Sequence, residues 1–425
     1  MKRSALANRP GAFTLVEVMV STALLVFIMV LVLSTVEQTQ KVWARASAKV
    51  SQFQVARNAF DSLTRRLSQA TLNTYYRAFD EDITQESSHY TYTRESEVQF
   101  MSAPTSKIVK SPSLPGVAGD PEFAYPTHSI FFTAPLGFTS ERDPNIKAAY
   151  VPRFRNLNSG LVATGYFIEH GEDPDVPQTL RDANLIPSRK RFRLMELDVP
   201  TEKLSIYRRP LDRANDIRRY RNDPQILSVD KTEYVGLIDR GRKPSDKWMR
   251  PLWMEEALAR ENNKEGSGEN DFRFKYGRVL ADNIVALVIL PKVAQKDRET
   301  PGRIDDLSPD YMYDSWRILA VDPKERWKAA RYNQLPPIIQ VTMVAIDEPS
   351  AARIADKYRD KLPEWTDGLF VKVTSEQNFR NELADLEKRL ATDPTKPNYR
   401  VFSTDVVIRG SKWSKDANIF IIDKP

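Results

Sequence analysis

The sequence predicts an α+β fold in which one long N-terminal helix, partly transmembrane, packs on a mostly antiparallel sheet with large inserted loops and helices. Two observations support the helix: the run from Phe13 to Val36 is apolar, and residues 37–72 contain no proline and no glycine. The sheet is predicted by short strand patterns, separated by Pro- and Gly-rich turns, that begin after Leu72. A helix followed by strands in this order is typical of the α+β class.

The first half of this helix is predicted to lie in a lipid bilayer. As a helix, the run from Phe13 to Val36 spans about 36 Å, which is enough to cross a hydrocarbon core of about 30 Å. Glu17 is the one charged residue in the run, whereas residues 1–12 contain three basic residues and no acid. Positive charge on this side predicts a cytoplasmic N-terminus and export of the rest. We therefore expect a leader, residues 1–12, and a transmembrane segment, residues 13–36.

The second half of the helix, residues 37–72, has the period of an amphipathic helix. Apolar residues recur at spacings of three and four, with charged residues between them. This apolar stripe is predicted to pack the helix on the sheet of a globular head, residues 73–425. The stripe consists of Phe53, Ala56, Phe60, Leu63, Leu67 and Ala70, and we expect Phe53, Phe60, Leu63 and Leu67 to make the packing contacts.

The head is predicted to contain short strands and a few helices, separated by polar, Pro-rich and Gly-rich segments. The predicted strands are Glu97–Met101, Ser129–Thr133, Leu161–Glu169, Phe192–Asp198, Leu204–Arg208, Ile284–Leu290, Ile338–Ile346, Val401–Ile408 and Ile419–Ile422. The predicted helices are residues 350–362, residues 376–391 and a shorter one at Trp253–Arg260. An exposed loop is expected at residues 265–270.

Three interpretations of the N-terminus compete. A secretory signal peptide has an apolar region of about 7–15 residues and a small-x-small cleavage site. Ala44-Arg45-Ala46 has that pattern, but it lies well past an apolar run that is too long. An ordinary membrane anchor explains the length and leaves Glu17 unexplained, because a lone carboxylate in lipid costs about 3 kcal/mol and is usually functional.

The third interpretation accounts for both the length and the acid. The string from Gly11 to Val18, Gly-Ala-Phe-Thr-Leu-Val-Glu-Val, resembles the cleavage and methylation motif of type IV prepilins. In that family a dedicated peptidase cuts before the apolar run, usually after Gly, and leaves a methylated Phe first and Glu fifth. Cutting after Ala12 keeps this register and makes Phe13 the methylated residue, whereas cutting after Gly11 makes Glu17 sixth. We favour the cut after Ala12, because the block from Phe13 to Glu17 is the more informative part.

The resemblance also implies a role for Glu17. In a packed bundle of helices in lipid, a carboxylate is stabilised by a positive partner. A free α-amino group on a neighbouring subunit is such a partner, and the pairing would set the axial register during assembly. The partners implied are other pilin-like or pseudopilin subunits, the prepilin peptidase and an inner-membrane assembly platform.

Later segments resemble the J-type minor pseudopilin of type II secretion systems, in the same order along the chain. These segments are residues 56–70, 279–287, 335–341 and 402–409. The chain is longer than that family usually is, and the excess is expected near residues 100–270 and 348–398. Residues 65–75 and 192–197 also resemble the Verru_Chthon cassette protein C family, a group of large pilin-like proteins of unknown function.

The sequence offers little chemistry outside the N-terminus. The absence of cysteine excludes disulfides, thiol nucleophiles and cysteine-bound metal. The three histidines, His89, His128 and His170, form no metal or catalytic motif, so we expect neither an enzyme nor a cofactor nor a metal site. The acidic runs at residues 80–82 and 305–306 lack the spacing of a calcium loop. The net charge of +6 and the Arg runs near residues 208 and 220 favour a solvated surface over a nucleic-acid partner.

These observations predict a minor pseudopilin or pilin-like structural subunit, processed at its N-terminus by prepilin peptidase and assembled with similar subunits at a filament tip. It would be a single-pass protein of the inner membrane, with a cytoplasmic N-terminus and a periplasmic or otherwise extracytoplasmic head. The alternative is a surface binding module that uses the same anchor to display its insertions to DNA or polysaccharide. Tight, salt-sensitive DNA binding by the head would favour that alternative.

Overall fold

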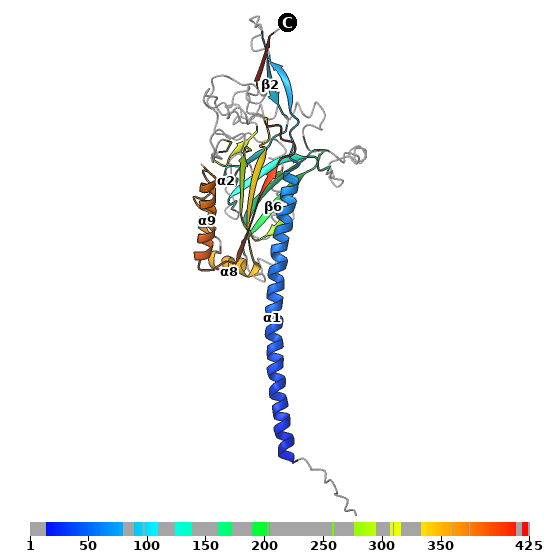
Figure 1. The fold of residues 1–425 in the computed structure, drawn as a ribbon, viewed down its shortest axis with the longest axis vertical. Coiled ribbons are helices and arrows are strands. Elements are labelled where there is room, and N and C mark those ends of the chain that lie inside the picture. The colour runs from blue at the N-terminus through cyan, green and yellow to red at the C-terminus, as the bar shows by residue number, and fades with distance from the viewer. Residues whose placement is uncertain are drawn as a thin grey trace, which may run out of the picture. The chain divides into compact units, whose positions relative to one another are not determined.

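The computed structural model confirms the α+β class: an apolar N-terminal helix is followed by antiparallel sheets and a few further helices (Figure 1). The chain divides into two compact units, Met1–Gln54 and Val55–Pro425. The structure describes residues 14–79, 89–96, 98–108, 124–137, 160–171, 189–201, 204, 257–258, 276–294, 307–308, 310–315, 333–359, 361–373, 375–413 and 419–423.

The long helix, α1, runs without interruption from Leu15 to Leu67. It ends five residues before the predicted boundary at Leu72. The N–H groups of residues 68–70 still donate to the preceding turn, but the carbonyl of Ser68 and the N–H of Thr71 bond to the head, so the helix does not continue. The carbonyl of Ser68 accepts from the N–H of Arg409 at 3.0 Å, and the N–H of Thr71 donates to the carbonyl of Thr133 at 2.9 Å.

A six-stranded antiparallel sheet forms the centre of the head, with the strand order β7-β6-β5-β4-β3-β9. The predicted strands at residues 129–133, 161–169 and 192–198 all belong to it, and β7 and β9 were not predicted. Its strands are β3 (Met101–Pro104), β4 (His128–Ala134), β5 (Val162–Gly171), β6 (Arg191–Val199), β7 (Gly277–Asp282) and β9 (Tyr313–Asp314).

The strand predicted at Glu97–Met101 is wrong in position, because β3 begins only at Met101. Side chains accept the hydrogen bond of a backbone N–H group in this segment that would otherwise bond to a neighbouring strand. The N–H of Val98 donates to Oδ1 of Asn73 at 3.2 Å and to Oγ of Ser96 at 3.3 Å. Pairing starts at Met101, which lies opposite Phe131 of β4 and Asp314 of β9.

A second, three-stranded antiparallel sheet has the order β11-β10-β8, with β8 (Ile284–Lys292) at one edge, β10 (Ile338–Ile346) in the centre and β11 (Tyr399–Val407) at the other edge. Strand β8 lies against β4, β5 and β6 of the central sheet. All nine residues of β8 are buried, which explains why this segment is a continuous apolar run and not an alternating one.

Between β7 and β8 the chain passes from the central sheet to the second sheet at a single residue. Asn283 separates β7 from β8 and has φ of +61°, a left-handed conformation that asparagine adopts more readily than most residues. Its N–H donates to the carbonyl of Phe192 at 2.7 Å, and its own carbonyl accepts from the N–H of Ile346 at 2.9 Å. Asn283 therefore joins β6 of one sheet to β10 of the other.

The third sheet is a small one with the order β1-β2-β12. Strand β12 (Ile419–Asp423) was predicted, whereas β1 (Tyr75–Phe79) and β2 (His89–Glu95) were not. Both missed strands are rich in tyrosine or threonine, residues with high strand propensity. That enrichment is the signal that would have located them.

The helices of the head flank the strands (Figure 1). Those that the structure describes over their whole length are the short α2 (Thr105–Ile108), α8 (Glu348–Tyr358), η6 (Glu364–Thr366) and α9 (Glu376–Thr392). Helix α8 is shifted toward the N-terminus relative to the predicted 350–362, because Asp347 caps it through the N–H of Ser350 at 3.0 Å. Helix α9 is capped in the same way by Ser375 and matches its predicted range.

Several predicted elements lie wholly or mostly outside the described residues. Only Leu204 of the predicted strand 204–208 and residues 257–258 of the predicted helix 253–260 are described, and the loop at 265–270 is outside. Within the region expected to be inserted, residues 100–270, strands β3 to β6 supply four of the six strands of the central sheet.

Candidate functional site: an apolar helix with an acidic first turn

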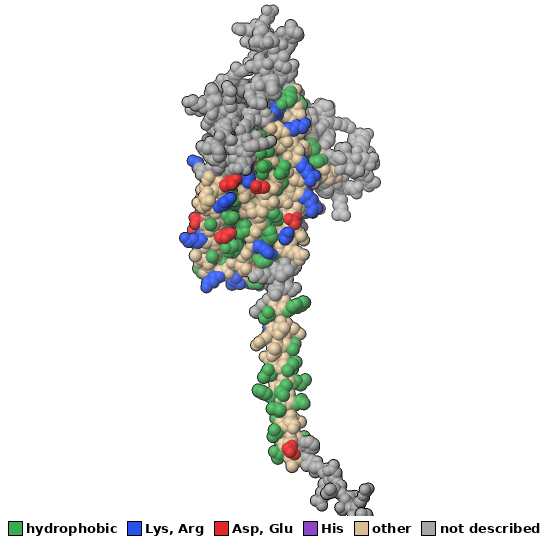
Figure 2. All heavy atoms as spheres, in the orientation of Figure 1, with side chains coloured by type: hydrophobic (Ala, Val, Ile, Leu, Met, Phe, Trp, Pro, Cys, Tyr) green, Lys and Arg blue, Asp and Glu red, His purple; other side chains and the backbone are tan. Residues whose placement is uncertain are grey.

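The N-terminal part of α1 presents apolar side chains to the outside along its whole length. Every residue from Thr14 to Trp43 is exposed, and Leu15 is 77% exposed. Figure 2 shows these hydrophobic side chains along the helix. The stretch Leu15–Trp43 is long and apolar enough to cross a membrane. An apolar surface of this extent marks an interaction with lipid or with other helices.

The one acid in the apolar run closes the first turn of the helix. The N–H of Thr14 donates to Oε2 of Glu17 at 3.0 Å, and the N–H of Glu17 donates to Oγ1 of Thr14 at 3.3 Å. This reciprocal pair is a capping box, the arrangement that Thr-x-x-Glu favours at the start of a helix. It explains why α1 begins at Leu15. The other residues of the predicted cleavage and methylation site, Gly11, Ala12 and Phe13, lie outside the described residues.

The amphipathic part of α1 is buried on the side that the sequence indicates. Phe53 and Phe60 are 8% and 6% exposed, and Leu63 and Leu67 have no exposed surface. The ring of Phe60 lies 5.9 Å from that of Phe402 on β11. Burial of one such side chain contributes about 1.5–3 kcal/mol. The contacts of Phe60, Leu63 and Leu67 fix the last two turns of α1 to the head.

A buried ion network adds a polar attachment at the end of α1. The guanidinium of Arg66 lies 3.1 Å from Glu196 and donates to both oxygens of Asp198 at 2.8 Å. Arg278 of β7 pairs with the other oxygen of Glu196, whose side chain has no exposed surface, and the hydroxyl of Tyr166 donates to Glu196 at 2.6 Å. Burial opposes the charge of Arg66, but the hydrogen bond to Asp198 raises its pKa.

The histidines are structural wherever their side chains are described. His128 is buried, its Nε2 lies 2.9 Å from the carbonyl oxygen of Phe370, and its Nδ1 lies 3.1 Å from the backbone nitrogen and 3.3 Å from the carbonyl oxygen of Ile289. Burial lowers the pKa of His128 to about 4, and burial with nearby Lys190 and Arg193 does the same for His170. Among the described residues, no group of three potential metal ligands comes together.

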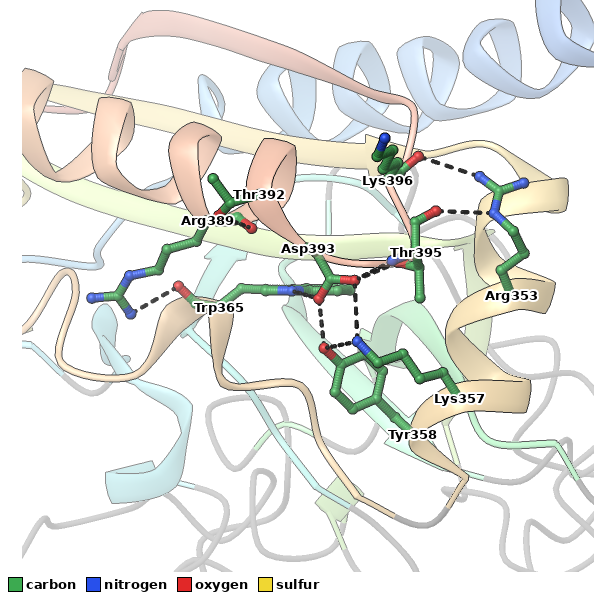
Figure 3. Close-up of polar contacts among 9 residues, drawn as sticks. All are labelled: Arg353, Lys357, Tyr358, Trp365, Arg389, Thr392, Asp393, Thr395 and Lys396. Atoms are coloured by element: carbon green, nitrogen blue, oxygen red, sulfur yellow. Dashed lines mark hydrogen bonds and ion pairs between the residues drawn. The ribbon is translucent and has the colours of Figure 1, made fainter.

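One cluster of hydrogen-bond donors around a single carboxylate in the head was not predicted from the sequence. Asp393, between α9 and β11, accepts hydrogen bonds from the hydroxyl of Tyr358 at 2.5 Å, from Nε1 of Trp365 at 2.9 Å and from the N–H and hydroxyl of Thr395 at 2.8 and 2.6 Å. Figure 3 shows these side chains converging on the carboxylate. Burial raises its pKa, but the hydrogen bonds outweigh burial and lower it to about 2.

The Asp393 cluster has a structural role: its hydrogen bonds brace neighbouring segments of the head against one another. Each carboxylate oxygen accepts at least two hydrogen bonds or ion pairs, so it has little capacity left for a substrate or a cation. Arg353 extends the brace by donating to the carbonyls of Thr395 and Lys396 (Figure 3). Together these bonds tie α8, η6 and the segment after α9 into one block.

The described site residues therefore fall into two groups. Glu17 and the exposed apolar positions belong to the outer surface of α1, while Phe60, Leu63 and Leu67 belong to the core of the head. The ion network around Glu196 could not be found from the sequence, because its bonded partners lie between 30 and 132 residues apart. No family model, no curated protein and no solved structure matches this chain.

Proposed function

We propose that this protein is a minor pseudopilin or pilin-like structural subunit. It is cut by prepilin peptidase, held in the inner membrane by its apolar helix, and assembled with other pilin-like subunits in a type II secretion or type IV pilus-like system. The observation that supports this proposal best is the single acid, Glu17, in the first turn of an otherwise apolar, exposed helix that continues into the head.

The apolar surface of α1 needs a partner that is not part of its own described fold. Lipid covers it while the subunit is in the membrane, and the helices of neighbouring subunits would cover it after assembly. Glu17 is costly in lipid, since its carboxylate prefers a positive partner there. A neighbouring α-amino group, created by cleavage after Ala12, supplies that charge and gives the assembly a defined register.

The size of the head and its attachment to α1 support a position at the end of a filament. The contacts of Phe60, Leu63 and Arg66 fix the head to its own helix, so assembly of the helices carries the head with them. A repeated shaft subunit must stack closely around the helical core. A head of this size, residues 73–425, suits a tip position better than a shaft position.

The mature N-terminus tests the processing step. Intact mass and N-terminal sequencing of the protein isolated from membranes are expected to give a methylated Phe13. A methylated Ala12 would mean cleavage after Gly11, with Glu17 in the sixth position, and would still agree with the proposal. An N-terminus near Ser47 would mean ordinary secretion and would overturn the proposal.

The assembly step is tested by replacing Glu17 with alanine. We expect Glu17→Ala to remain in the membrane and to lose co-purification with other pilin-like subunits by at least about ten-fold, because a buried charge pair is lost. Glu37→Ala is the matched control, since Glu37 lies on the same helix and forms an exposed pair with Lys41 one turn away. Equal co-purification of the wild type and Glu17→Ala would refute the assigned role.

A further inference from the structure

The two edges of the second sheet differ in what their backbone groups meet. At the β8 edge, side chains next to β4 bond to the strand: the N–H of Leu287 donates to Oγ1 of Thr127 at 3.1 Å, and the backbone nitrogen of Ile289 lies 3.1 Å from Nδ1 of His128. At the other edge, β11 pairs with β10 and with no further strand among those described. The first edge is therefore closed, and the second is open in the described part of the chain.

The hydrogen bonds at the two ends of β11 show which of its backbone groups point away from β10. The carbonyl of Asn398 accepts from the N–H of Asp347 at 3.1 Å, and the N–H of Ile408 donates to the carbonyl of Pro337 at 3.1 Å. An antiparallel ladder bonds through alternate residues, and the register between these two ends is continuous. The even-numbered residues therefore bond to β10, and the N–H and C=O groups of the odd-numbered ones point outward: Tyr399, Val401, Ser403, Asp405 and Val407.

These outward groups form a strand edge without the usual protection. No described residue bonds to them, and Ser403, Asp405 and Val407 are exposed. Exposed edges are normally blocked by proline, lysine, a bulge or a very short strand, because an open edge pairs with other chains. Strand β11 has nine residues, contains neither proline nor lysine, and pairs with β10 without a bulge. Its outward acid, Asp405, is matched by Nζ of Lys292 at 2.8 and 2.9 Å and so repels little.

The end of α1 beside this strand indicates which molecule can reach the edge. The ring of Phe402 lies 5.9 Å from that of Phe60, and the N–H of Arg409 donates to the carbonyl of Ser68 at 3.0 Å. Strand β11 and the end of α1 therefore run side by side in the same direction. Two copies that paired antiparallel through β11 would have these helix ends in opposite directions, whereas the subunits of a filament share one direction. A strand from a different subunit avoids this conflict.

We propose that β11 binds an extended strand of a neighbouring pilin-like subunit, which extends the second sheet and runs antiparallel to β11. This inference rests on the proposed function, because such a neighbour reaches the edge when it packs beside α1. In strand addition the backbone bonds give the affinity and alternate side chains give the specificity. The strand that fits has β-branched residues opposite Val401 and Val407, and an acid opposite the exposed Arg400.

Photocrosslinking of the full-length protein in its own cell membranes tests the partner. Benzoylphenylalanine in place of Ser403 keeps the outward N–H, and the same group in place of Arg380, an exposed residue of α9, is the control. Mass spectrometry is expected to find, from position 403 alone, a segment with the predicted side-chain pattern in another chain that has a prepilin-type N-terminus. Crosslinks only within one chain or to a second copy, equal crosslinks from both positions, or none from position 403 would overturn the proposal.

A proline tests the outward backbone bond itself. Ser403→Pro removes an outward N–H, spares the ladder to β10, and loses the hydroxyl that lies 2.7 Å from Oγ1 of Thr342. Thr342→Val removes the same side-chain bond from the other strand and keeps the edge intact. We expect Ser403→Pro to reduce co-purification of the crosslinked subunit by at least about five-fold, and Thr342→Val to leave it unchanged.

A second variant decides the matter if Ser403→Pro lowers the thermal transition of the head. Val407 is 64% exposed, so Val407→Lys adds a charge at the edge without disturbing the core. We expect it to reduce co-purification to a similar extent. Co-purification equal to that of the wild type would contradict the proposal.

Failure of this inference can be told apart from failure of the proposed function. A methylated Phe13 and Glu17-dependent co-purification, together with full co-purification of folded Ser403→Pro, would overturn the strand docking and leave the proposed function standing. An uncut N-terminus and a wild type that binds no pilin-like subunit would overturn both.

Discussion

Two stretches of one helix have the same backbone and opposite surroundings. Between Leu15 and Trp43 the apolar side chains of α1 are exposed, with Leu25 at 65%, whereas Leu63 near the other end has no exposed surface. Helical propensity does not distinguish the two stretches. The difference lies in what covers each stretch: the head covers the second, whereas nothing in the described part of the chain covers the first. Solubility and stability should therefore depend on different ends of α1.

The largest expected effect comes from removing the exposed stretch. A chain that begins at Gln38 lacks the apolar run and keeps the buried positions from Phe53 to Leu67. We expect it to move from the membrane pellet almost entirely to the supernatant without detergent, because no other membrane-spanning helix is found among the described residues. Ultracentrifugation measures the shift, and a cooperative thermal transition serves as the control for folding. Persistent sedimentation of a folded chain would show that the head itself binds the membrane.

The next largest effect is expected at the buried ion network. Glu196→Ala leaves Arg66, Arg278 and the hydroxyl of Tyr166 without their shared acceptor. We expect a loss of about 3–5 kcal/mol in the free energy of unfolding, since the buried hydroxyl of Tyr166 loses its acceptor and Arg66 keeps only one of its two carboxylates. Chemical denaturation of the chain that begins at Gln38 gives this value. The exposed pair of Arg57 and Asp61 on the same helix is the comparison, and Asp61→Ala should change stability by less than about 0.5 kcal/mol.

A smaller effect is expected from a matched pair of leucines on α1. Leu63→Ala opens a cavity between the helix and the head and should lower the free energy of unfolding by about 3 kcal/mol. Leu25→Ala removes the same atoms from the exposed stretch and should leave the unfolding of the head unchanged. Thermal denaturation of the full-length protein in detergent compares the two. Equal destabilisation by both variants would mean that the two stretches are not separate in their energetics.

The parts of the fold that were predictable are those with a strong local pattern. The period of Phe53, Phe60 and Leu63 indicates one face of a helix, and the apolar run from Ile284 to Leu290 indicates a buried strand. The end of α1 was not predictable, because the carbonyl of Ser68 bonds to Arg409, far along the chain. The strands β1 and β2 are indicated by their enrichment in tyrosine and threonine and not by an alternating hydrophobic pattern.

The candidate site was predictable only in its local part. Glu17 is conspicuous as the one acid in an apolar run, and its partner in the capping box, Thr14, lies only three residues away. The contacts of His128 cannot be found in this way, because Ile289 and Phe370 are 161 and 242 residues away. A lone histidine in the sequence gives no indication of which backbone groups it bonds.

The single-residue joint at Asn283 determines more than the path of the chain. Strand β8 is apolar on both faces, so its hydrophobic pattern alone would allow it to pair with β10 after a slip of one residue, with every side chain turned to the opposite face. The two ends of the strand prevent this slip. Asn283 fixes its start through Phe192 and Ile346, and Lys292 fixes its end by bonding to Asp405 of β11 at 2.8 Å. A polar residue at each end thus specifies an alignment that the apolar residues between them leave ambiguous.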